Sequence, residues 1–414
     1  MTNSKNIIAT YYLKPSKDIS LKEASKKLAD EHSLGMWTSK GVKIDHLSRY
    51  AAKIININKN LNIVKVSYPI ENIDLKDGGI PSILSYIAGD AFGSTYVDCL
   101  RLIDITLPNE LLRYFNGPKF GIEGVRKLIG AESKKPLLGV ILKPSLGMNI
   151  DRFEKIIEIA SKLGVDVIKD DEKMINPSYL TIEKRLKKAM DIINKNSKKT
   201  GKQTLYAINI SLKPHILLEK AREAVKKGAN VIMINAIVEG IGIIQSLVED
   251  QDINVPIYAH RTMHATMTRS NCFGISMVVL AKLLRIAGAD FIHCGSISKR
   301  HATQEEFIAN LGDAIVNNMG MIKKSVPVIS AGIHPGNINA HIKFIKDMNP
   351  EYVYDVLFMV GTAVYAHPDG VKAGIKALQQ AIEVSMSGKD FLKESQNLRE
   401  LRRAINYFGY IDGY

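Results

Sequence analysis

The chain has 414 residues, a length that allows two or three domains. Hydrophobic residues make up 46% of it and charged residues 24%, which is typical of a folded globular protein and excludes an intrinsically disordered chain. The formal net charge of +14 raises nucleic acid as a partner. However, the densest basic run, residues 184–202, has a helical pattern followed by an expected turn at KNSKKTGK, residues 195–202, and it lacks interleaved aromatic residues. We therefore expect a solvated lysine-rich face there and do not expect nucleic-acid binding.

The sequence also bears on the compartment. No apolar run approaches the roughly 18 residues that a membrane-spanning helix needs. Residues 1–13 lack the basic start, long apolar stretch and small-residue cleavage site of a signal peptide. The three cysteines, Cys99, Cys272 and Cys294, lie singly along the chain, and this odd, low number favours a reducing compartment and argues against a disulfide framework. We expect a cytoplasmic protein that does not contact membranes.

The first 125 residues mix strand and helix patterns. Period-two alternation and β-branched residues predict strands, and charged residues interleaved with apolar ones predict helices. The predicted elements are strands at 7–13, 63–68 and 100–106, strand-like alternation within 42–61, a helix at 21–31 and a second helix near 83–93. We expect residues 1–125 to form an N-terminal α+β domain.

From Pro136 onward, a short apolar run followed by a helical pattern occurs eight times. The runs are Leu137–Leu142, Val165–Ile168, Thr204–Ile208, Val231–Ile234, Pro256–Ala259, Phe291–Ile292, Pro327–Ile329 and Val353–Val360. Their spacing, roughly 25–40 residues, leaves room for one strand, one helix and two loops in each unit. Eight parallel strands with intervening helices predict a closed (β/α)8 TIM barrel, of α/β class, over residues 126–414.

Polar residues follow these apolar runs again and again. Barrel enzymes carry their chemistry at the carboxyl ends of the strands, so we expect these residues to meet at one mouth of the barrel. They are Lys143, Lys169, Asp170, Asp171, Glu172, Asn209, Asn235, His260, Arg261, His293, Ser330, Gly361 and Thr362.

The strongest local signal is the sequence IKDDEK at residues 168–173. An isolated run of this kind is usually a solvated turn, but charges at the end of a buried strand need partners. Two carboxylates offer the hard oxygen ligands that suit Mg²⁺. The lysine beside them would repel a cation, unless its amine is neutral or converted to an acid such as a carbamate formed with CO2.

Seven segments of the chain resemble motifs of one enzyme family and occur in the same order. They are EHSLGMWT at 31–38, NGPKFGIEGVRKLIG at 116–130, GVILKPSLG at 139–147, GVDVIKDDE at 164–172, YAHRTMHA at 258–265, FIHCGS at 291–296 and ISAGIHPG at 329–336. The family is the RuBisCO large-subunit superfamily. The resemblance covers nearly the whole chain, and its motifs are highly specific.

The resemblance implies a role for each matching residue. Lys169 would carry the carbamate and, with Asp171 and Glu172, would bind Mg²⁺. Lys143 would be the catalytic acid–base, and His260 would contact a substrate hydroxyl.

The resemblance also implies a substrate site shared between two chains. The residues expected to hold one phosphate group or other parts of the substrate are Arg261, His293, Ser330, Gly332 and Gly361. Glu31, Trp37 and Asp90 would reach the site from the N-terminal domain of the other chain of a homodimer, with Asp90 in a catalytic role. The implied substrate is a small phosphorylated keto compound.

Several residues depart from the carboxylase pattern. Ser145 stands where carboxylases have a second lysine, and Asp90 replaces an asparagine. Met359 and Val360 precede Gly361 where the family has three glycines, which suggests the loss of a second phosphate site. These departures favour a RuBisCO-like protein of the form IV type: an Mg²⁺-dependent enolase or isomerase of carbohydrate or methionine-salvage metabolism that forms an enediolate without fixing CO2.

Other functions stay open at this point. One is decarboxylation of an oxo-sugar-acid phosphate in apiose-type catabolism, and another is genuine ribulose-bisphosphate carboxylation. A third is a basic RNA-binding or regulatory scaffold on a retained fold. His264 and His334 could each be a structural histidine near the mouth, and the role of Lys299 and Arg300 is not assigned.

Overall fold

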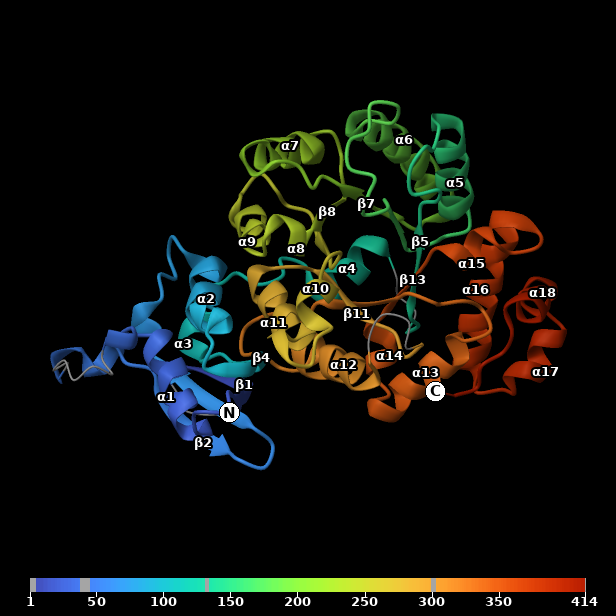
Figure 1. Cartoon of the computed structure of the whole chain (residues 1–414). Helices are drawn as coiled ribbons and strands as arrows, with labels where there is room; N and C mark the ends of the chain where they lie inside the picture. Colours follow the sequence, from blue (N-terminus) through green and yellow to red (C-terminus); the bar gives the residue numbers. More distant parts are fainter. Residues whose placement is uncertain (1–4, 38–44, 131–133, 299–302, 414) are drawn as a thin grey trace.

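Two bodies make up the molecule (Figure 1): a small N-terminal sheet with its helices, coloured blue, and a larger barrel surrounded by helices. The computed structural model describes residues 5–37, 45–130, 134–298 and 303–413. The predicted fold class, an α/β barrel preceded by an N-terminal domain, is confirmed.

The N-terminal body is built around a five-stranded sheet with the order β10-β4-β1-β3-β2. Its first four strands in the chain are β1 (Ile7–Pro15), β2 (Lys53–Asn58), β3 (Ile63–Tyr68) and β4 (Val97–Thr106), and its longer helices are α1 (Leu21–Glu31) and α2 (Gly79–Ile87). β1 alternates between buried and half-buried residues because successive side chains of a strand point to opposite faces. The Ser20 side chain caps α1 by accepting a hydrogen bond from the amide of Glu23.

The fifth strand of this sheet comes from the barrel half of the chain. β10 (Phe273–Ile275) pairs in parallel with residues 100–102 of β4. Beside this pairing a disulfide joins Cys99 to Cys272 across 173 positions of sequence. The expectation of unpaired cysteines is therefore wrong for these two, because the fold brings together residues whose spacing gave no sign of pairing, whereas Cys294 is free and buried.

The barrel closes through eight parallel strands in the order β11-β12-β13-β5-β6-β7-β8-β9. The strands are β5 (Leu137–Ile141), β6 (Val167–Lys169), β7 (Leu205–Asn209), β8 (Val231–Asn235), β9 (Ile257–His260), β11 (Phe291–Gly295), β12 (Val326–Ser330) and β13 (Leu357–Val360). Each of the eight predicted runs overlaps one of them. The last strand is shorter than predicted, because Tyr352–Asp355 forms a helical turn, α14. An apolar run alone does not separate a short helix from a strand.

Helices cover the outside of the barrel (Figure 1). Those of eight residues or more are α4 (Gly121–Ile129), α5 (Ile150–Lys162), α6 (Ile182–Thr200), α7 (Pro214–Lys226), α9 (Gly242–Glu249), α11 (Met277–Ala287), α13 (Ile338–Met348), α16 (Gly370–Ser387) and α18 (Arg399–Phe408). Shorter helices elsewhere in the chain are α3 (Asn109–Leu112), α8 (Ala236–Glu239), α10 (Ala265–Thr268), α12 (Gln304–Ala309), α15 (Thr362–Tyr365) and α17 (Phe391–Gln396). Within the described ranges, none of the helices has both the length and the apolar character to cross a membrane.

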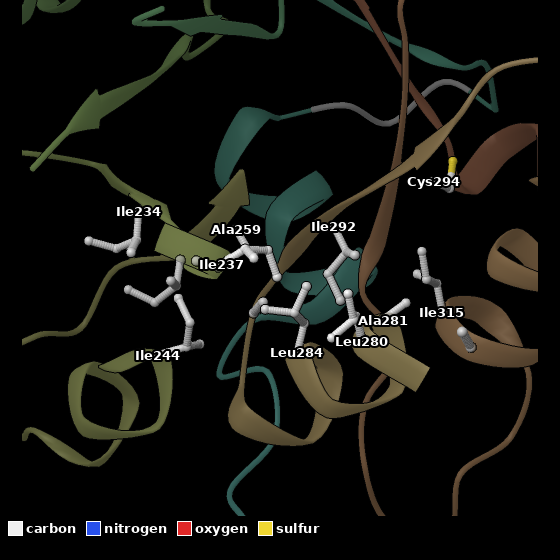
Figure 2. Close-up of a cluster of buried hydrophobic side chains, with 14 of the residues drawn as sticks. Ile234, Ile237, Ile244, Ala259, Leu280, Ala281, Leu284, Ile292, Cys294 and Ile315 are labelled. Atoms are coloured by element: carbon white, nitrogen blue, oxygen red, sulfur yellow. The ribbon is translucent and has the colours of Figure 1, made fainter. Parts of the chain in front are cut away.

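The barrel core has two layers, because alternate strand residues face inward and outward. Tyr258, Phe291 and Met359 belong to the inner cluster, which fills the barrel. The outer layer lies between strands and helices; Figure 2 shows part of it, with the labelled residues Ile234, Ile237, Ile244, Ala259, Leu280, Ala281, Leu284, Ile292, Cys294 and Ile315. This packing fixes the strand ends, and therefore the side chains that follow them.

Candidate active site

A cavity of about 420 Å³ opens at the carboxyl ends of the barrel strands, as predicted for the active site. Its lining includes the predicted residues Lys143, Glu172, His260, Arg261, His293, Ser330, Gly332, Gly361 and Thr362. They follow six strands that are consecutive around the barrel, β9, β11, β12, β13, β5 and β6. The structure thus brings together residues that lie far apart in the sequence.

The acidic residues at the end of β6 lie in two different environments. Lys169, Asp170 and Asp171 are all fully buried. Asp170 accepts hydrogen bonds from the guanidinium of Arg185 (3.1 Å), the hydroxyl of Tyr206 (2.7 Å) and the amide of Asn209 (2.9 Å). Burial raises the pKa of Asp170, although Arg185 opposes the shift. Asp170 therefore anchors the strand end and is not available to a ligand.

Asp171 lies in a compact polar cluster with Lys143 and Ser145. The Nζ atom of Lys143 lies 2.6 Å from Asp171 Oδ2 and 2.9 Å from Ser145 Oγ. Ser145 Oγ also donates to Asp171 Oδ2 over 2.9 Å. Burial raises the pKa of Asp171, but the hydrogen bond and the charge of Lys143 outweigh it, so the pKa lies below its usual value. Asp171 is a carboxylate at neutral pH.

Among the described residues, Lys169 forms no ion pair at contact distance, although the charges of Glu172, Asp171 and Asp170 act on it. Its Nζ atom donates to the backbone carbonyl of Asp170 (2.7 Å) and lies 6.0 Å from the centre of the Tyr258 ring. Burial lowers the pKa of this lysine to about 8, so a substantial fraction is neutral in weakly alkaline solution.

The acidic groups at the mouth are few. Across the described ranges, no three His, Cys, Asp or Glu side chains form a group that could hold a metal ion. Asp171 and Glu172 supply hard oxygen atoms beside Lys169, so a carbamate on this lysine would supply the third acidic ligand. The residues present therefore fit the implied set, in which one ligand is not an unmodified amino acid.

Two strand-end asparagines hold the backbone of Glu172. The Nδ2 atoms of Asn209 and Asn235 donate to the carbonyl oxygen of Glu172 over 3.1 and 2.9 Å. These two residues, expected at the mouth from their position after β7 and β8, thus act on the backbone of a predicted ligand and do not line the cavity.

His260 and His293 lie edge to face, with 4.7 Å between their ring centres. His260 Nε2 is 3.9 Å from Glu172 Oε2. Burial lowers the pKa of both histidines well below the usual value, and positively charged neighbours add to the effect. Both rings are therefore neutral imidazoles at pH 7, each able to donate one hydrogen bond and accept another.

The side of the cavity predicted to hold a phosphate is formed by residues at the ends of β9, β11 and β12. Arg261 is only 6% exposed, and its burial lowers the pKa of the guanidinium, an effect that Glu306 opposes. His293 Nδ1 lies 3.3 Å from Ser330 Oγ. The next residue, Ala331, has a left-handed φ of 81°, which is strained for a side chain with a Cβ atom.

The two bulky residues before Gly361 both line the cavity, although they are almost entirely buried. Met359 and Val360 are each 1% exposed and belong to the inner and outer core layers. A Cβ atom added at Gly361 would make ordinary van der Waals contact with its neighbours, of which the nearest is Lys143 Cε at 3.5 Å.

The three predicted residues of the N-terminal domain do not line the cavity of their own chain. Glu31 accepts hydrogen bonds from Tyr96 (2.7 Å) and Ser94. Trp37 is 43% exposed, and its indole N–H donates to the carbonyl of Leu34. Asp90 is exposed at the start of a short 3-10 turn, Asp90–Gly93. Their contribution to a partner's site stays a prediction.

His264 and His334, the two histidines expected near the mouth without an assigned role, have different surroundings. His264 lines the cavity, with Nδ1 2.9 Å from the carbonyl oxygen of Arg261. His334 stacks on Phe408 at 5.6 Å between ring centres and does not line the cavity. Lys299 and Arg300 lie outside the described residues.

Sequence reasoning missed two tyrosines beneath the site. The hydroxyl of Tyr365 donates to the carbonyl of Ile141 (2.9 Å) and accepts from the amide of Lys143 (3.2 Å). The hydroxyl of Tyr258 lies 2.7 Å from His293 Nε2. Tyr258 could have been found by period-two alternation, because it precedes His260 by two residues on the same strand.

Family models match both bodies of the chain. Residues 121–408 match the catalytic domain of the ribulose bisphosphate carboxylase large chain, and residues 1–111 match its N-terminal domain. The ribulose bisphosphate carboxylase of Pyrococcus furiosus is 32% identical over 98% of this chain and 94% of the relative.

Solved structures give the same result. A dimeric archaeal Rubisco from Hyperthermus butylicus has a TM-score of 0.88 at 30% identity, covering 99% of this chain and 98% of that chain. A rubisco-like protein from Alicyclobacillus acidocaldarius has a TM-score of 0.83 at 27% identity, covering 98% and 100%.

These relatives overturn the prediction of a RuBisCO-like enolase or isomerase that fixes no CO2. Full-length relatives at about 31% identity carry the carboxylase name, and archaeal Rubisco structures match the fold. They favour the carboxylase alternative and do not establish the form IV type. Single replacements, such as Ser145 and Met359, are weaker evidence about the reaction than a match to carboxylases over the whole chain.

Proposed function

The chain belongs to the ribulose bisphosphate carboxylase large-chain family, and from this premise we propose that it forms an enediolate from ribulose 1,5-bisphosphate and carboxylates it. One observation carries the proposal: a single cavity joins Lys143 and Glu172, beside the acidic cluster, to Arg261, His293 and Ser330 across the mouth. Such a cavity can hold a keto group at one side and a phosphate at the other.

We propose Mg²⁺ as the cofactor, held by a carbamate on Lys169 and by the carboxylates of Asp171 and Glu172. When bound there, the ion polarises the ketone oxygen of the substrate and stabilises the enediolate. The fit of this donor set and the low pKa of Lys169, about 8, support the assignment, because CO2 reacts with a neutral amine.

Lys143 acts as the acid–base group in this proposal. Its Nζ atom lies 2.6 Å from Asp171 Oδ2. When the Asp171 carboxylate turns to bind the metal ion, this ion pair breaks and Nζ is released toward the cavity. The released amine exchanges a proton at the carbon next to the ketone. His260, a neutral imidazole at the cavity wall, orients a substrate hydroxyl.

The two phosphates would take opposite sides of the cavity. Arg261 offers a planar set of donors for one phosphate, with His293, Ser330 and Gly332 beside it. The second phosphate would bind on the β13 side, where Gly361 and Thr362 line the cavity.

We also propose a homodimer with two equivalent shared sites. The dimeric archaeal Rubisco among the structural neighbours supports this assembly. Glu31, Trp37 and Asp90 would then complete the partner's cavity, since they lie away from their own.

The test is incorporation of ¹⁴C-bicarbonate into acid-stable product with ribulose 1,5-bisphosphate and Mg²⁺. We expect fixation by the wild type and its loss in Lys143→Met. Lys213→Met is the matched control, because Lys213 is exposed, precedes α7 and does not line the cavity. Proton exchange into the sugar without fixation of label would contradict the proposal.

A further inference from the structure

We propose that Tyr258 is a positioning residue that fixes the tautomer of His293 with its hydrogen on Nδ1, so that His293 and its neighbour Ser330 together present donors to an anion in the cavity. The inference rests on the proposed function only in taking that anion to be a substrate phosphate. The hydrogen-bond geometry itself does not depend on which reaction the enzyme performs.

Packing holds the two side chains in one arrangement. Tyr258 is fully buried and His293 is 3% exposed. The Tyr258 ring stacks on Phe291 with 5.3 Å between ring centres and meets the His293 ring edge to face at 5.4 Å. These contacts direct the hydroxyl of Tyr258 at His293 Nε2, 2.7 Å away.

The direction of this hydrogen bond follows from the surroundings of the hydroxyl. Within the part of the chain that the structure describes, the hydroxyl hydrogen of Tyr258 has no other acceptor than His293. If Nε2 were the donor, that hydrogen would be buried without a partner, which is unfavourable. The hydroxyl therefore donates and Nε2 accepts.

The hydrogen of His293 must then lie on the other nitrogen. A neutral imidazole carries one N–H group, so an accepting Nε2 places it on Nδ1. Burial keeps the pKa of His293 well below its usual value and the pKa of Tyr258 well above its own. Neither group changes its protonation state near neutrality.

This tautomer determines what the cavity offers to a ligand. With a hydrogen on Nδ1, the oxygen of Ser330 can accept it over 3.3 Å, and the serine hydroxyl is free to donate into the cavity. Beside Arg261, this corner then presents donors only. In the opposite tautomer, Nδ1 would present a lone pair and take the serine hydrogen, and an anion would meet an acceptor.

A direct test is the ¹⁵N NMR spectrum of the full-length protein labelled at histidine. His293→Gln identifies the signals of His293 by their loss. We expect an unprotonated Nε2 and a protonated Nδ1 in the wild type. Tyr258→Phe keeps the ring and removes the hydroxyl, so the populations should shift toward the Nε2–H form.

Calorimetry with inorganic phosphate tests the consequence for binding. We expect Tyr258→Phe to weaken phosphate binding about tenfold, the value of one lost hydrogen bond. Tyr11→Phe is the matched control: Tyr11 is equally buried, its hydroxyl donates to the carbonyl of Ile87 (2.7 Å), and it does not line the cavity. This variant should bind phosphate as the wild type does.

Three results separate the outcomes. An Nε2–H tautomer in the wild type overturns the inference, even if Tyr258→Phe does not fold. An unchanged tautomer or unchanged phosphate affinity in a folded Tyr258→Phe also overturns it. Failure of the proposed function alone would appear as absent CO2 fixation, with the tautomer and the phosphate result intact.

Discussion

Lys169 is fully buried, and its neutral amine is the form that reacts with CO2 to give the proposed carbamate. Its pKa of about 8 means that the neutral fraction rises from about a tenth at pH 7 to about nine-tenths at pH 9. At constant dissolved CO2 and with Mg²⁺ present, we expect the carbamate on Lys169 to increase over this range. The measurement is ¹³C NMR after addition of ¹³C-labelled bicarbonate.

A lysine variant provides the control for this measurement. Lys169→Arg should lose the carbamate signal, whereas Lys213→Met should keep it, because Lys213 is exposed and remote from the acidic cluster. A carbamate signal that is already complete at pH 7, or that survives Lys169→Arg, would contradict the assignment.

Ser145 is the clearest residue-scale departure from the carboxylase pattern. Its hydroxyl lies 2.9 Å from both Lys143 Nζ and Asp171 Oδ2, so it contacts the proposed acid–base lysine and a proposed Mg²⁺ ligand. We expect Ser145→Ala to lower kcat about tenfold with little change in KM, since the lost contact acts on the acid–base lysine and not on a phosphate. Steady-state carboxylation kinetics measure both values, and a change confined to KM would argue against this role.

At the scale of elements, β6 is tied to α6 by a fully buried ion pair. The guanidinium of Arg185 lies 3.1 Å from Asp170 and also donates to the carbonyls of Leu180 and Ile175. We expect Arg185→Met to lower the free energy of unfolding by about 3–5 kcal/mol, because it leaves Asp170 buried without a counterion. Urea denaturation measures the change.

The double variant Arg185→Met, Asp170→Asn distinguishes the cause. If the uncompensated charge of Asp170 dominates, the double variant should recover part of the lost stability. A double variant less stable than the single one would show that packing around the Arg185 side chain matters more.

The barrel was predictable from the sequence because its strands are buried on both faces. Runs such as Val231–Ile234 are apolar throughout, and each is followed by an amphipathic helix. The helical turn Tyr352–Asp355 was not, since its apolar residues continue directly into β13. The expected turn over the basic residues before Gly201 is also helical as far as Thr200.

Within the site, residue types were predictable, but the direction of each side chain was less so. The acidic run predicted charged residues at the end of β6. The buried hydrogen bond between Asp170 and Arg185, however, follows only from the fold. The contact between Tyr258 and His293 joins β9 to β11, and no spacing in the sequence encodes it. Pairings between distant elements are therefore what the sequence leaves out.

At the scale of the molecule, a disulfide bond links the two bodies in addition to the backbone. The disulfide between Cys99 and Cys272 closes a loop of 173 positions, and restriction of the unfolded chain could contribute up to about 5 kcal/mol. We expect Cys99→Ser to unfold at lower denaturant concentration than the oxidised wild type. With a reductant present, the two proteins should unfold together; a difference that persists would point to packing around the cysteine.

The proposed dimer predicts complementation between two inactive chains. Asp171→Ala removes a proposed metal ligand of the barrel, and Glu31→Ala alters the proposed N-terminal contribution to the partner's cavity. A mixed dimer would contain one intact site, so CO2 fixation should return in purified heterodimers carrying two different tags. No recovery in verified heterodimers would contradict shared sites.

The parallel pairing of β10 with β4 limits how far the chain can be treated as modular. A fragment that ended before the barrel would present β4 as a bare edge, with unpaired amide and carbonyl groups that invite association with other chains. A barrel fragment would in turn lose the anchor for the segment between Arg261 and Ser276, since Arg101 donates to carbonyls within it. β10 belongs to the barrel half of the chain but pairs within the N-terminal sheet. A chimera made with a relative must therefore take β10 and β4 from the same parent.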